Sequence, residues 1–348
     1  MKKPIALLFT DIHIERDDID LVKSILEQSL ELAREKHIRY IFLLGDIFTE
    51  RTGQNMFCLN LFLWYVGKFN TKNVNQELFI IAGNHDKVDQ NIKASYLDIY
   101  DVHRNVTVIN EYDFLTVDGM TFHFIPYFKD KKKIEKILNS FPTNDNDYLL
   151  THLAFNGVMN NDGELVTEGI PIKWAKRFKK VFVGHYHNES TVGSNIHYIG
   201  SSHAHNFGEN NNKGFTLLYN DGSHELIRSS FPKYIQKKID LSVMNRVQIE
   251  SLKKKYSGSE NFIRFKFIGT DEQLVTIDKR EYEKVGIDVK KESVELIRGV
   301  HSAENNSFVS FNSKKIKQCF FEYCSKNKIT GKRKELGLNY MNKNVASS

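Results

Sequence analysis

A polar tetrapeptide that directly follows a buried strand constrains this chain more than any other feature. The apolar run at 78–82 is short and ends at a glycine, which predicts a buried strand. Gly83-Asn84-His85-Asp86 comes next, so its side chains would lie in the loop at the carboxyl end of that strand. In open α/β sheets this edge is where ligands bind. Because Asn and Asp also favour ordinary turns, one such loop does not distinguish a turn from a site.

The same arrangement recurs along the first two thirds of the chain. Other short apolar runs predict further strands, at 5–10, 40–44, 106–109, 121–125, 147–151, 180–183, 196–199 and 214–219. Polar residues close several of these runs, namely Asp11 with His13, Asp46, His152, and His185 with His187. Helical spacing over 19–33 and an apolar stretch at 55–69 predict helices between the first strands. This alternation is the βαβ rhythm of an α/β sheet covered by helices.

The residue types at these strand ends are those of a metal site. Histidine and carboxylate ligands suit Zn, Fe or Mn, and the candidate ligands are Asp11, His13, Asp46, Asn84, His152, His185 and His187. Seven ligands exceed what one catalytic metal holds, but they fit two metals about 3.5–4 Å apart that share a bridging carboxylate. Such a pair holds a phosphate and activates a water. His85 is left over, beside a ligand but free to donate a proton or to stabilise the leaving group.

Each of these residues also has a structural interpretation, since a single histidine or a Gly-Asp turn is common in folded proteins. The joint occurrence of five motifs, in order and at five predicted strand ends, favours the metal site. The other histidines are expected to be structural: His37, His103, His123, His197, His203, His205, His224 and His301.

The composition argues against a membrane protein or a disulfide-stabilised one. Hydrophobic residues make up 41% and charged residues 26% of 348 positions, as in globular proteins. No apolar stretch approaches the length of a membrane span, and residues 1–5 lead into a strand without a signal-peptide pattern. Three cysteines do not make a disulfide framework. We therefore expect an intracellular, cytoplasmic protein.

The net charge of +6 is unevenly distributed. Residues 1–230 hold 25 Lys and Arg against 29 Asp and Glu, whereas residues 231–348 hold 24 against 14. A basic C-terminal third predicts a polyanionic partner, with nucleic acid as the first candidate. The alternative is a solvated, lysine-rich surface.

As a set, the motifs resemble the calcineurin-like metallophosphoesterase pattern over residues 5–230. They are Asp11-x-His13, Gly45-Asp46, Gly83-Asn84-His85-Asp86, His152 and Gly184-His185-x-His187. Within that superfamily the chain is similar to the SbcD-type nucleases of double-strand-break repair, including phage recombination nuclease subunits. The supporting stretches are Gly45–Phe48, Ile125–Phe128, Ile199–Ser202, Phe207–Glu209 and Lys213-Gly214. The chain departs from that pattern at Ile199, where the family has Pro, and at Thr49, where it often has another polar residue.

The resemblance implies a ligand set for each metal. One metal would be held by Asp11, His13, Asp46 and His187, and the other by Asp46, Asn84, His152 and His185. Asp46 would bridge them, and His85 would be the catalytic histidine. The implied cofactor is a pair of divalent ions, Mn²⁺ first, with Mg²⁺, Fe²⁺ and Zn²⁺ as alternatives. The implied location is the cytoplasm of a bacterium or of a phage-infected host.

The expected fold class is α/β (α+β), a four-layer metallophosphoesterase β-sandwich flanked by helices, with a small C-terminal α+β capping domain. The expected domains are the nuclease domain at 1–235, the capping, DNA-binding domain at 236–305, and a partner-binding helix with a disordered tail at 306–348. In the C-terminal third the pattern predicts a crossing point at 231–233, strands at 261–268 and 293–297, a short helix within 271–285 and an amphipathic helix at 313–328.

Three functions are compatible with these features. The first is a metal-dependent DNA exo/endonuclease subunit whose 313–328 helix docks on an SbcC-type ABC ATPase. That helix could equally pack on its own domain, and a homodimer is a further option. The second is a phosphatase or cyclic-nucleotide phosphodiesterase, although Ile47–Glu50 departs from the Arg that Ser/Thr phosphatases carry after Gly-Asp. The third is a non-catalytic scaffold, against which the complete ligand set argues.

Overall fold

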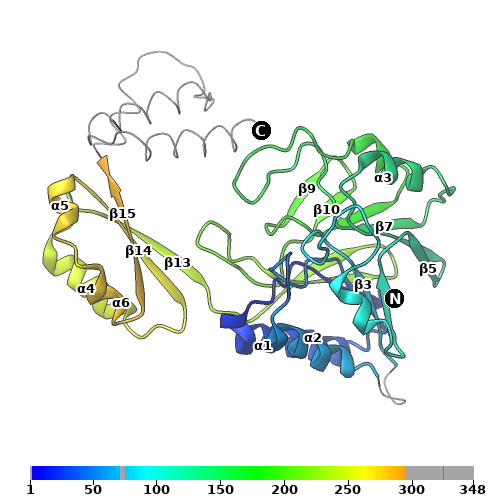
Figure 1. Ribbon diagram of the computed structural model, residues 1–348, viewed down its shortest axis with the longest axis horizontal. Helices are drawn as coiled ribbons and strands as arrows, with labels where there is room; N and C mark the ends of the chain where they lie inside the picture. The colour runs from blue at the N-terminus through cyan, green and yellow to red at the C-terminus, as the bar shows by residue number, and fades with distance from the viewer. Residues whose placement is uncertain (1, 71–74, 295–323, 325–348) are drawn as a thin grey trace, which may run out of the picture. The chain divides into compact units, whose positions relative to one another are not determined.

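The computed structural model of the chain describes residues 2–70, 75–294 and 324. Of these, residues 2–70, 75–269 and 273–292 form one compact unit, and residues 270–272, 293 and 294 are grouped apart from it. The described strands make two six-stranded sheets and one three-stranded sheet (Figure 1).

The first six-stranded sheet has the strand order β12-β11-β1-β2-β3-β4. Its strands are β1 (Pro4–Phe9), β2 (Tyr40–Leu43), β3 (Glu77–Ile81), β4 (Val106–Ile109), β11 (Gly214–Tyr219) and β12 (His224–Arg228). β1 to β4 run parallel, and β11 returns antiparallel beside β1. α1 (Ile19–Glu35) and α2 (Met56–Gly67) connect the first three strands. α2 begins where it does because the Asn55 side chain accepts a hydrogen bond from the Phe57 N–H.

The second six-stranded sheet has the order β5-β6-β7-β8-β10-β9. It consists of β5 (Asp113–Val117), β6 (Met120–Ile125), β7 (Asp147–Thr151), β8 (Lys180–Val183), β9 (Ser190–Val192) and β10 (Ile196–Tyr198), with α3 (Lys131–Leu138) between β6 and β7. β6, β7, β8 and β10 run parallel. Three short 3₁₀ turns complete this part of the chain: η1 (Arg16–Asp18), η2 (Tyr96–Tyr100) and η3 (Ile172–Trp174).

The two sheets pack face to face, and helices cover their outer faces. Leu7 and Phe9 of β1 are buried in the core that contains the apolar faces of α1 and α2. Ala6 and Leu8, on the opposite face of the same strand, join a core made by both sheets. Across that core the Phe42 ring lies 5.3 Å from the Phe122 ring. A strand buried on both faces reads as a continuous apolar run, which explains the runs in the sequence.

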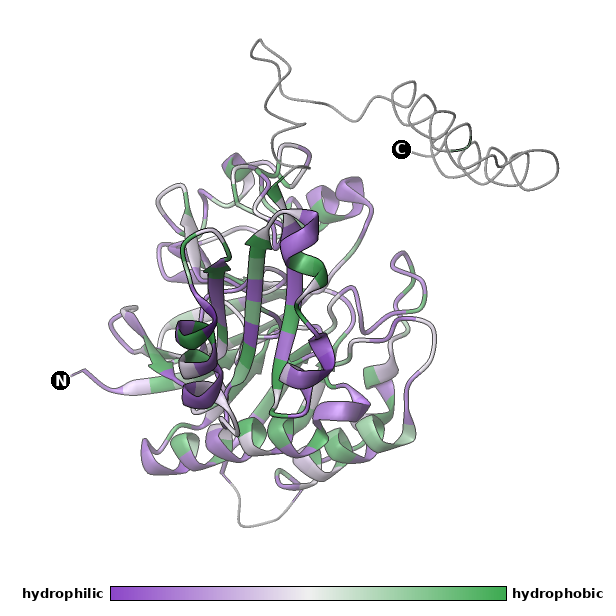
Figure 2. Cartoon of the chain, turned by 90° about the vertical axis from the view of Figure 1, so that its left-hand side faces the viewer, coloured by the Kyte–Doolittle hydropathy of each residue, from purple (hydrophilic) through white to green (hydrophobic). Residues whose placement is uncertain are grey.

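A three-stranded sheet follows, in the order β13-β14-β15. Its strands are β13 (Tyr234–Asp240), β14 (Phe262–Gly269) and β15 (Ile287–Ser293), and its helices are α4 (Arg246–Tyr256), α5 (Asp271–Val275) and α6 (Lys279–Glu283). β14 alternates strictly between buried and half-buried positions, and Figure 2 shows polar and apolar residues alternating along this sheet. One face of the sheet is therefore its core, built around Phe265 and Phe267.

The predicted fold class is confirmed: sheets in an α/β arrangement are flanked by helices, and an α+β module follows. The crossing point at 231–233 lies between β12 and β13, and the region 271–285 forms two short helices where one was predicted. Of the strand predicted at 293–297, only residues 293 and 294 are described: Ser293 is the last residue of β15, and Val294 is helical. The helix predicted at 313–328 and the tail lie outside the described residues, except for Cys324. The predicted domain boundaries stay a prediction.

No helix within the described ranges is long and apolar enough to cross a bilayer.

Candidate active site

The candidate ligands lie in five loops at the carboxyl ends of parallel strands. The first sheet contributes the loops after β1, β2 and β3, and the second sheet those after β7 and β8. These loops carry Asp11 and His13, Asp46, Asn84 with His85, His152, and His185 with His187. Because parallel strands end at the same edge of a sheet, two stacked sheets bring all five loops together.

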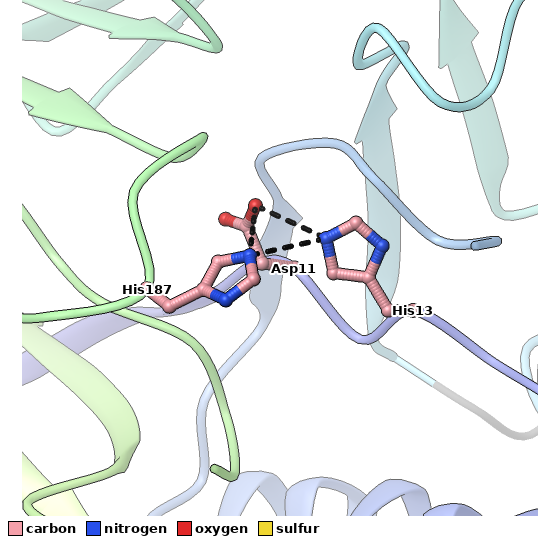
Figure 3. Close-up of side chains that lie close together, drawn as sticks. All are labelled: Asp11, His13 and His187. Atoms are coloured by element: carbon pink, nitrogen blue, oxygen red, sulfur yellow. Dashed lines mark hydrogen bonds and ion pairs between the residues drawn. The ribbon is translucent and has the colours of Figure 1, made fainter. Parts of the chain in front are cut away.

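The first cluster consists of Asp11, His13 and His187 (Figure 3). The Nε2 atoms of His13 and His187 lie 3.3 Å apart, and Asp11 Oδ1 lies 3.7 Å from the first and 3.8 Å from the second. Two ligands bound to one ion at about 2.1 Å lie roughly 3–3.5 Å apart. Asp11 Oδ1 is buried and has no hydrogen-bond partner among the described residues. A buried, unpartnered carboxylate oxygen between two imidazole nitrogens fits a bound cation.

The second cluster consists of Asp46, Asn84, His152 and His185. His152 Nε2 lies 3.2 Å from Asp46 Oδ2 and 3.1 Å from Asn84 Oδ1, and His185 Nδ1 lies 2.9 Å from the same amide oxygen. His152 Nδ1 faces the Leu44 carbonyl at 2.6 Å. With Nδ1 donating to that carbonyl, Nε2 faces two oxygens that carry lone pairs, and in the neutral ring it carries a lone pair itself. Such a convergence of acceptors fits a divalent cation.

Asp46 lies between the two clusters. Its Oδ2 atom is 3.7 Å from His13 Nε2 in the first cluster and 3.2 Å from His152 Nε2 in the second. Its Oδ1 atom accepts the backbone N–H of His85 at 2.8 Å, which fixes the carboxylate plane. One carboxylate is thus positioned to serve two cations.

The backbone of these loops is strained where the candidate ligands stand. Asp11, His13, Asp46 and His185 have φ values of 51°, 46°, 52° and 87°. Non-glycine residues in this region cost on the order of 1–3 kcal/mol each and concentrate at functional sites. Gly83 has no positive φ and is required for a steric reason, because any Cβ there would clash with the Asp46 carboxylate.

Burial and neighbouring charges shift the pKa values of Asp11 and His152 in opposite directions. Burial raises the pKa of Asp11, but the neighbouring imidazoles of His13, His152 and His187 lower it to about 2. Burial lowers the pKa of His152, but the Asp46 carboxylate outweighs it and raises that pKa to about 9. Burial lowers the pKa of His185 to about 4. A pair of groups with pKa values pushed apart inside one site is typical of functional centres.

His85 lies beside both clusters and has its own hydrogen bonds. Its Nδ1 faces the Thr49 carbonyl at 2.6 Å, and its Nε2 accepts from the Arg51 guanidinium at 2.8 Å. Burial lowers its pKa, against the charge of Asp46. A nitrogen of His85 also lies within 4.8 Å of ligand atoms of His13 and Asp46. The position therefore suits a proton-transfer residue, and a third cation cluster is the alternative that the geometry leaves open.

A cavity of about 330 Å³ opens onto these groups. Its lining includes His13, Asp46, His85, His185 and His187. Arg51, which is exposed, is the one lysine or arginine among the described residues that line it.

Several residues at the site were not predicted. His205 was expected to be structural, but its Nε2 donates to the Asp11 carbonyl at 2.9 Å and its ring centroid lies 5.1 Å from that of His13. Glu209 accepts from His187 Nδ1 at 2.8 Å. Asp86 accepts from the N–H groups of Ile47 and Gly83, and so ties two ligand loops together. The pair His203-x-His205 after a predicted strand was the available signal for the first of these.

Comparison with known proteins agrees with this geometry. A viral protein named "Putative phosphoesterase 244L", from Invertebrate iridescent virus 6, is 24% identical over 250 residues, which cover 70% of this chain and 85% of the viral one. "Putative phosphoesterase 078R" from Invertebrate iridescent virus 3 is 21% identical over 207 residues, which cover 59% of each chain.

Among solved structures, "Putative 5'-Nucleotidase" from Staphylococcus aureus has a TM-score of 0.38 at 12% identity, over 66% of this chain and 53% of that one. A novel archaeal phosphodiesterase has a TM-score of 0.34 at 12% identity, over 65% and 99%. The model of the calcineurin-like phosphoesterase family matches residues 6–189. These residues include all the ligand loops described above, and the chain belongs to the calcineurin-like phosphoesterase family.

Proposed function

We propose that this phosphoesterase is a metal-dependent DNA exo/endonuclease, the nuclease subunit of an SbcCD-type complex in DNA recombination, repair and replication. The observation that carries the proposal is the continuation of the chain beyond the phosphoesterase domain. An α+β module follows at 234–293, and residues 231–348 carry a net charge of +10 against −4 for residues 1–230. A basic extension in the same chain as a phosphodiester-cleaving site suits a polyanionic substrate.

The family uses divalent metal ions, and the two clusters supply the ligands for them. We propose Asp11, His13, Asp46 and His187 for the first ion. The second ion is assigned to Asp46, Asn84, His152 and His185. A pair of divalent ions held there would polarise the phosphate and generate a nucleophile from water near neutral pH. Mn²⁺ is the first ion to test, followed by Mg²⁺, Fe²⁺ and Zn²⁺.

His85 and Arg51 contribute the remaining chemistry. His85 lines the cavity, and its Nε2 would take up the proton released by the attacking water and pass it to the leaving oxygen, giving up the hydrogen bond from Arg51. Arg51 supplies a permanent positive charge in a cavity whose other lining residues include carboxylates and imidazoles. A guanidinium binds phosphate oxygens in a bidentate manner.

The partner proteins are proposed on the sequence alone. Residues 313–328, which fall outside the described ranges, carry Ile316 and Phe320 at helical spacing and are assigned as the docking segment for an SbcC-type ABC ATPase. Replacement of both by Asp should abolish co-purification with that ATPase while the nuclease activity of the isolated chain persists. A homodimer is the second assembly to measure.

The decisive experiment compares substrates on the purified full chain. End-labelled double- and single-stranded DNA, p-nitrophenyl phosphate and a 2′,3′-cyclic nucleotide are each incubated with Mn²⁺. We expect DNA cleavage that exceeds turnover of the small substrates and disappears with EDTA and in the Asp46→Asn variant. His37→Asn is a matched control, because His37 also has a positive φ (54°) but lies outside the site.

Efficient turnover of the small substrates with intact DNA would replace the nuclease proposal by a phosphatase or cyclic-nucleotide phosphodiesterase. Absence of hydrolysis of any phosphate ester, with both metals bound, would favour a non-catalytic scaffold.

A further inference from the structure

A buried ion pair behind the first cluster has no role in the chemistry described so far. Glu209 and Lys213 lie in the loop after β10, and both are buried. Lys213 Nζ lies 2.9 Å from Glu209 Oε2. A buried pair of this kind rarely contributes net stability compared with apolar residues of the same size. The contacts of Glu209 and Lys213 with His187 indicate another role.

Glu209 controls the ring of His187. Its Oε1 atom accepts from His187 Nδ1 at 2.8 Å and from the Asn206 side chain at 2.9 Å. Because a carboxylate can only accept, the Nδ1 proton is held on that side, and His187 Nε2 is left as a lone pair facing Asp11 and His13. The ring is thereby fixed in the tautomer and orientation that a cation requires.

Lys213 holds the backbone of the same ligand. Its ammonium group donates to the His187 carbonyl and, at 3.2 Å, to the Asn188 side chain. The same loop also reaches Asp11, since His205 donates from Nε2 to the Asp11 carbonyl while its own N–H donates to Glu209 Oε2. One loop therefore contacts two of the three members of the first cluster.

The second cluster has a different support. His152 is oriented by a backbone carbonyl, that of Leu44, and neither Glu209 nor Lys213 contacts His152 among the hydrogen bonds of the described residues. The two clusters thus differ in the group that accepts the hydrogen bond from the imidazole Nδ1. It is a carboxylate for His187 and a neutral backbone carbonyl for His152.

We propose that the Glu209–Lys213 pair is a positioning device that sets the affinity of the first cluster for a divalent cation independently of the second. The inference rests on the proposed metal assignment. Glu209 fixes the tautomer and the orientation of the His187 ring. Lys213 pairs with the Glu209 carboxylate and holds the His187 backbone carbonyl.

The test measures cation binding and does not depend on turnover. Full-length protein is stripped with chelator and titrated with Mn²⁺ in a calorimeter, for the wild type, Glu209→Gln, Lys213→Met and the double variant. We expect Glu209→Gln to weaken one binding step by about 10–100-fold, as loss of such outer partners does, and to leave the other step within about twofold. Glu77→Gln is the matched control, because Glu77 pairs with Arg39 at an exposed position at the start of β3.

The double variant separates positioning from structural support. Glu209→Gln alone leaves the Lys213 ammonium buried without its partner, which lowers the melting temperature. The double variant removes both charges, so we expect the melting temperature to recover while the weakened binding step does not. Recovery of both quantities would overturn the proposal, and so would an equal loss at both steps.

A second measurement reads the tautomer directly. In metal-free wild type, ¹⁵N spectra should place the His187 proton on Nδ1, and Glu209→Ala should mix the two tautomers. An unchanged tautomer would overturn the proposal. If instead the wild type binds fewer than two Mn²⁺ per chain, the metal assignment of the proposed function fails, which is a different outcome.

Discussion

Replacement of Asp46 by Asn tests whether one carboxylate serves two cations. Asn is nearly isosteric and tolerates the left-handed backbone at this position, where φ is 52°. Its amide oxygen can still accept the His85 N–H, as Asp46 Oδ1 does at 2.8 Å. The other carboxylate oxygen becomes an NH₂ group, and this is the atom that lies 3.2 Å from His152 and 3.7 Å from His13. The variant therefore removes the bridging atom and little else.

Two magnitudes follow from these contacts. Each cation loses an anionic ligand, for which we expect at least about a 100-fold increase in Kd, or roughly 2.8 kcal/mol for each ion. In the metal-free protein, Asp46 raises the pKa of His152 from 6.5 to about 9, against the effect of burial. That shift corresponds to about 3 kcal/mol of unfolding free energy below pH 6.5, which the variant should lose.

Calorimetric titration of chelator-treated protein with Mn²⁺ measures the first quantity, and urea unfolding in EDTA measures the second. Asp118→Asn is the control, since Asp118 has a φ of 50° in an exposed turn away from the site. Two Mn²⁺ bound by Asp46→Asn with wild-type affinity would refute the bridge. Loss of one ion only would assign Asp46 to a single cluster.

Three further predictions follow. His85→Ala should retain both cations and lose about 10²–10⁴-fold in DNA hydrolysis, and reduced Mn²⁺ stoichiometry would move His85 into the ligand set. Because the pKa of His152 is raised to about 9, its stabilising contribution to metal-free protein is complete below pH 6.5 and lost as the pH rises through 9. The unfolding free energy of the wild type should fall over this window relative to Asp46→Asn, and parallel profiles would contradict the assignment. Removal of residues 231–348 should weaken DNA binding and flatten its dependence on salt; an unchanged slope would place the phosphate contacts on the phosphoesterase domain.

The buried strands were predictable because their side chains face a core on both sides. Several predicted runs coincide with observed strands, such as β4 (Val106–Ile109), β7 (Asp147–Thr151) and β8 (Lys180–Val183). β5 (Asp113–Val117) was missed, since it is an edge strand with exposed positions and lacks an apolar run. α3 (Lys131–Leu138) was missed because only Ile134 and Leu138 are buried in a lysine-rich segment.

The candidate ligands were also predictable from short stretches of sequence, but contacts between residues far apart in the sequence were not. Motifs such as Asp11-x-His13 and Gly184-His185-x-His187 are local, so the order of residue types alone predicted a shared edge. The sequence did not predict which atoms meet. The division into two clusters around Asp46 was implied by the family resemblance alone, and the contacts of Asp46 Oδ2 that join them form when the two sheets stack.

The sequence by itself therefore determined the fold class, the strand ends and the residue types of a metal-dependent phosphoesterase, because each is encoded by short-range patterns of apolar and polar residues. Tertiary structure alone decided the outer partners. Arg51 meets His85 across 34 residues, and His205 meets Asp11 across 194. Glu209 meets His187 across a chain reversal between β8 and β11. Such contacts depend on how loops from different strands pack, and loop packing leaves no periodic signature in the chain.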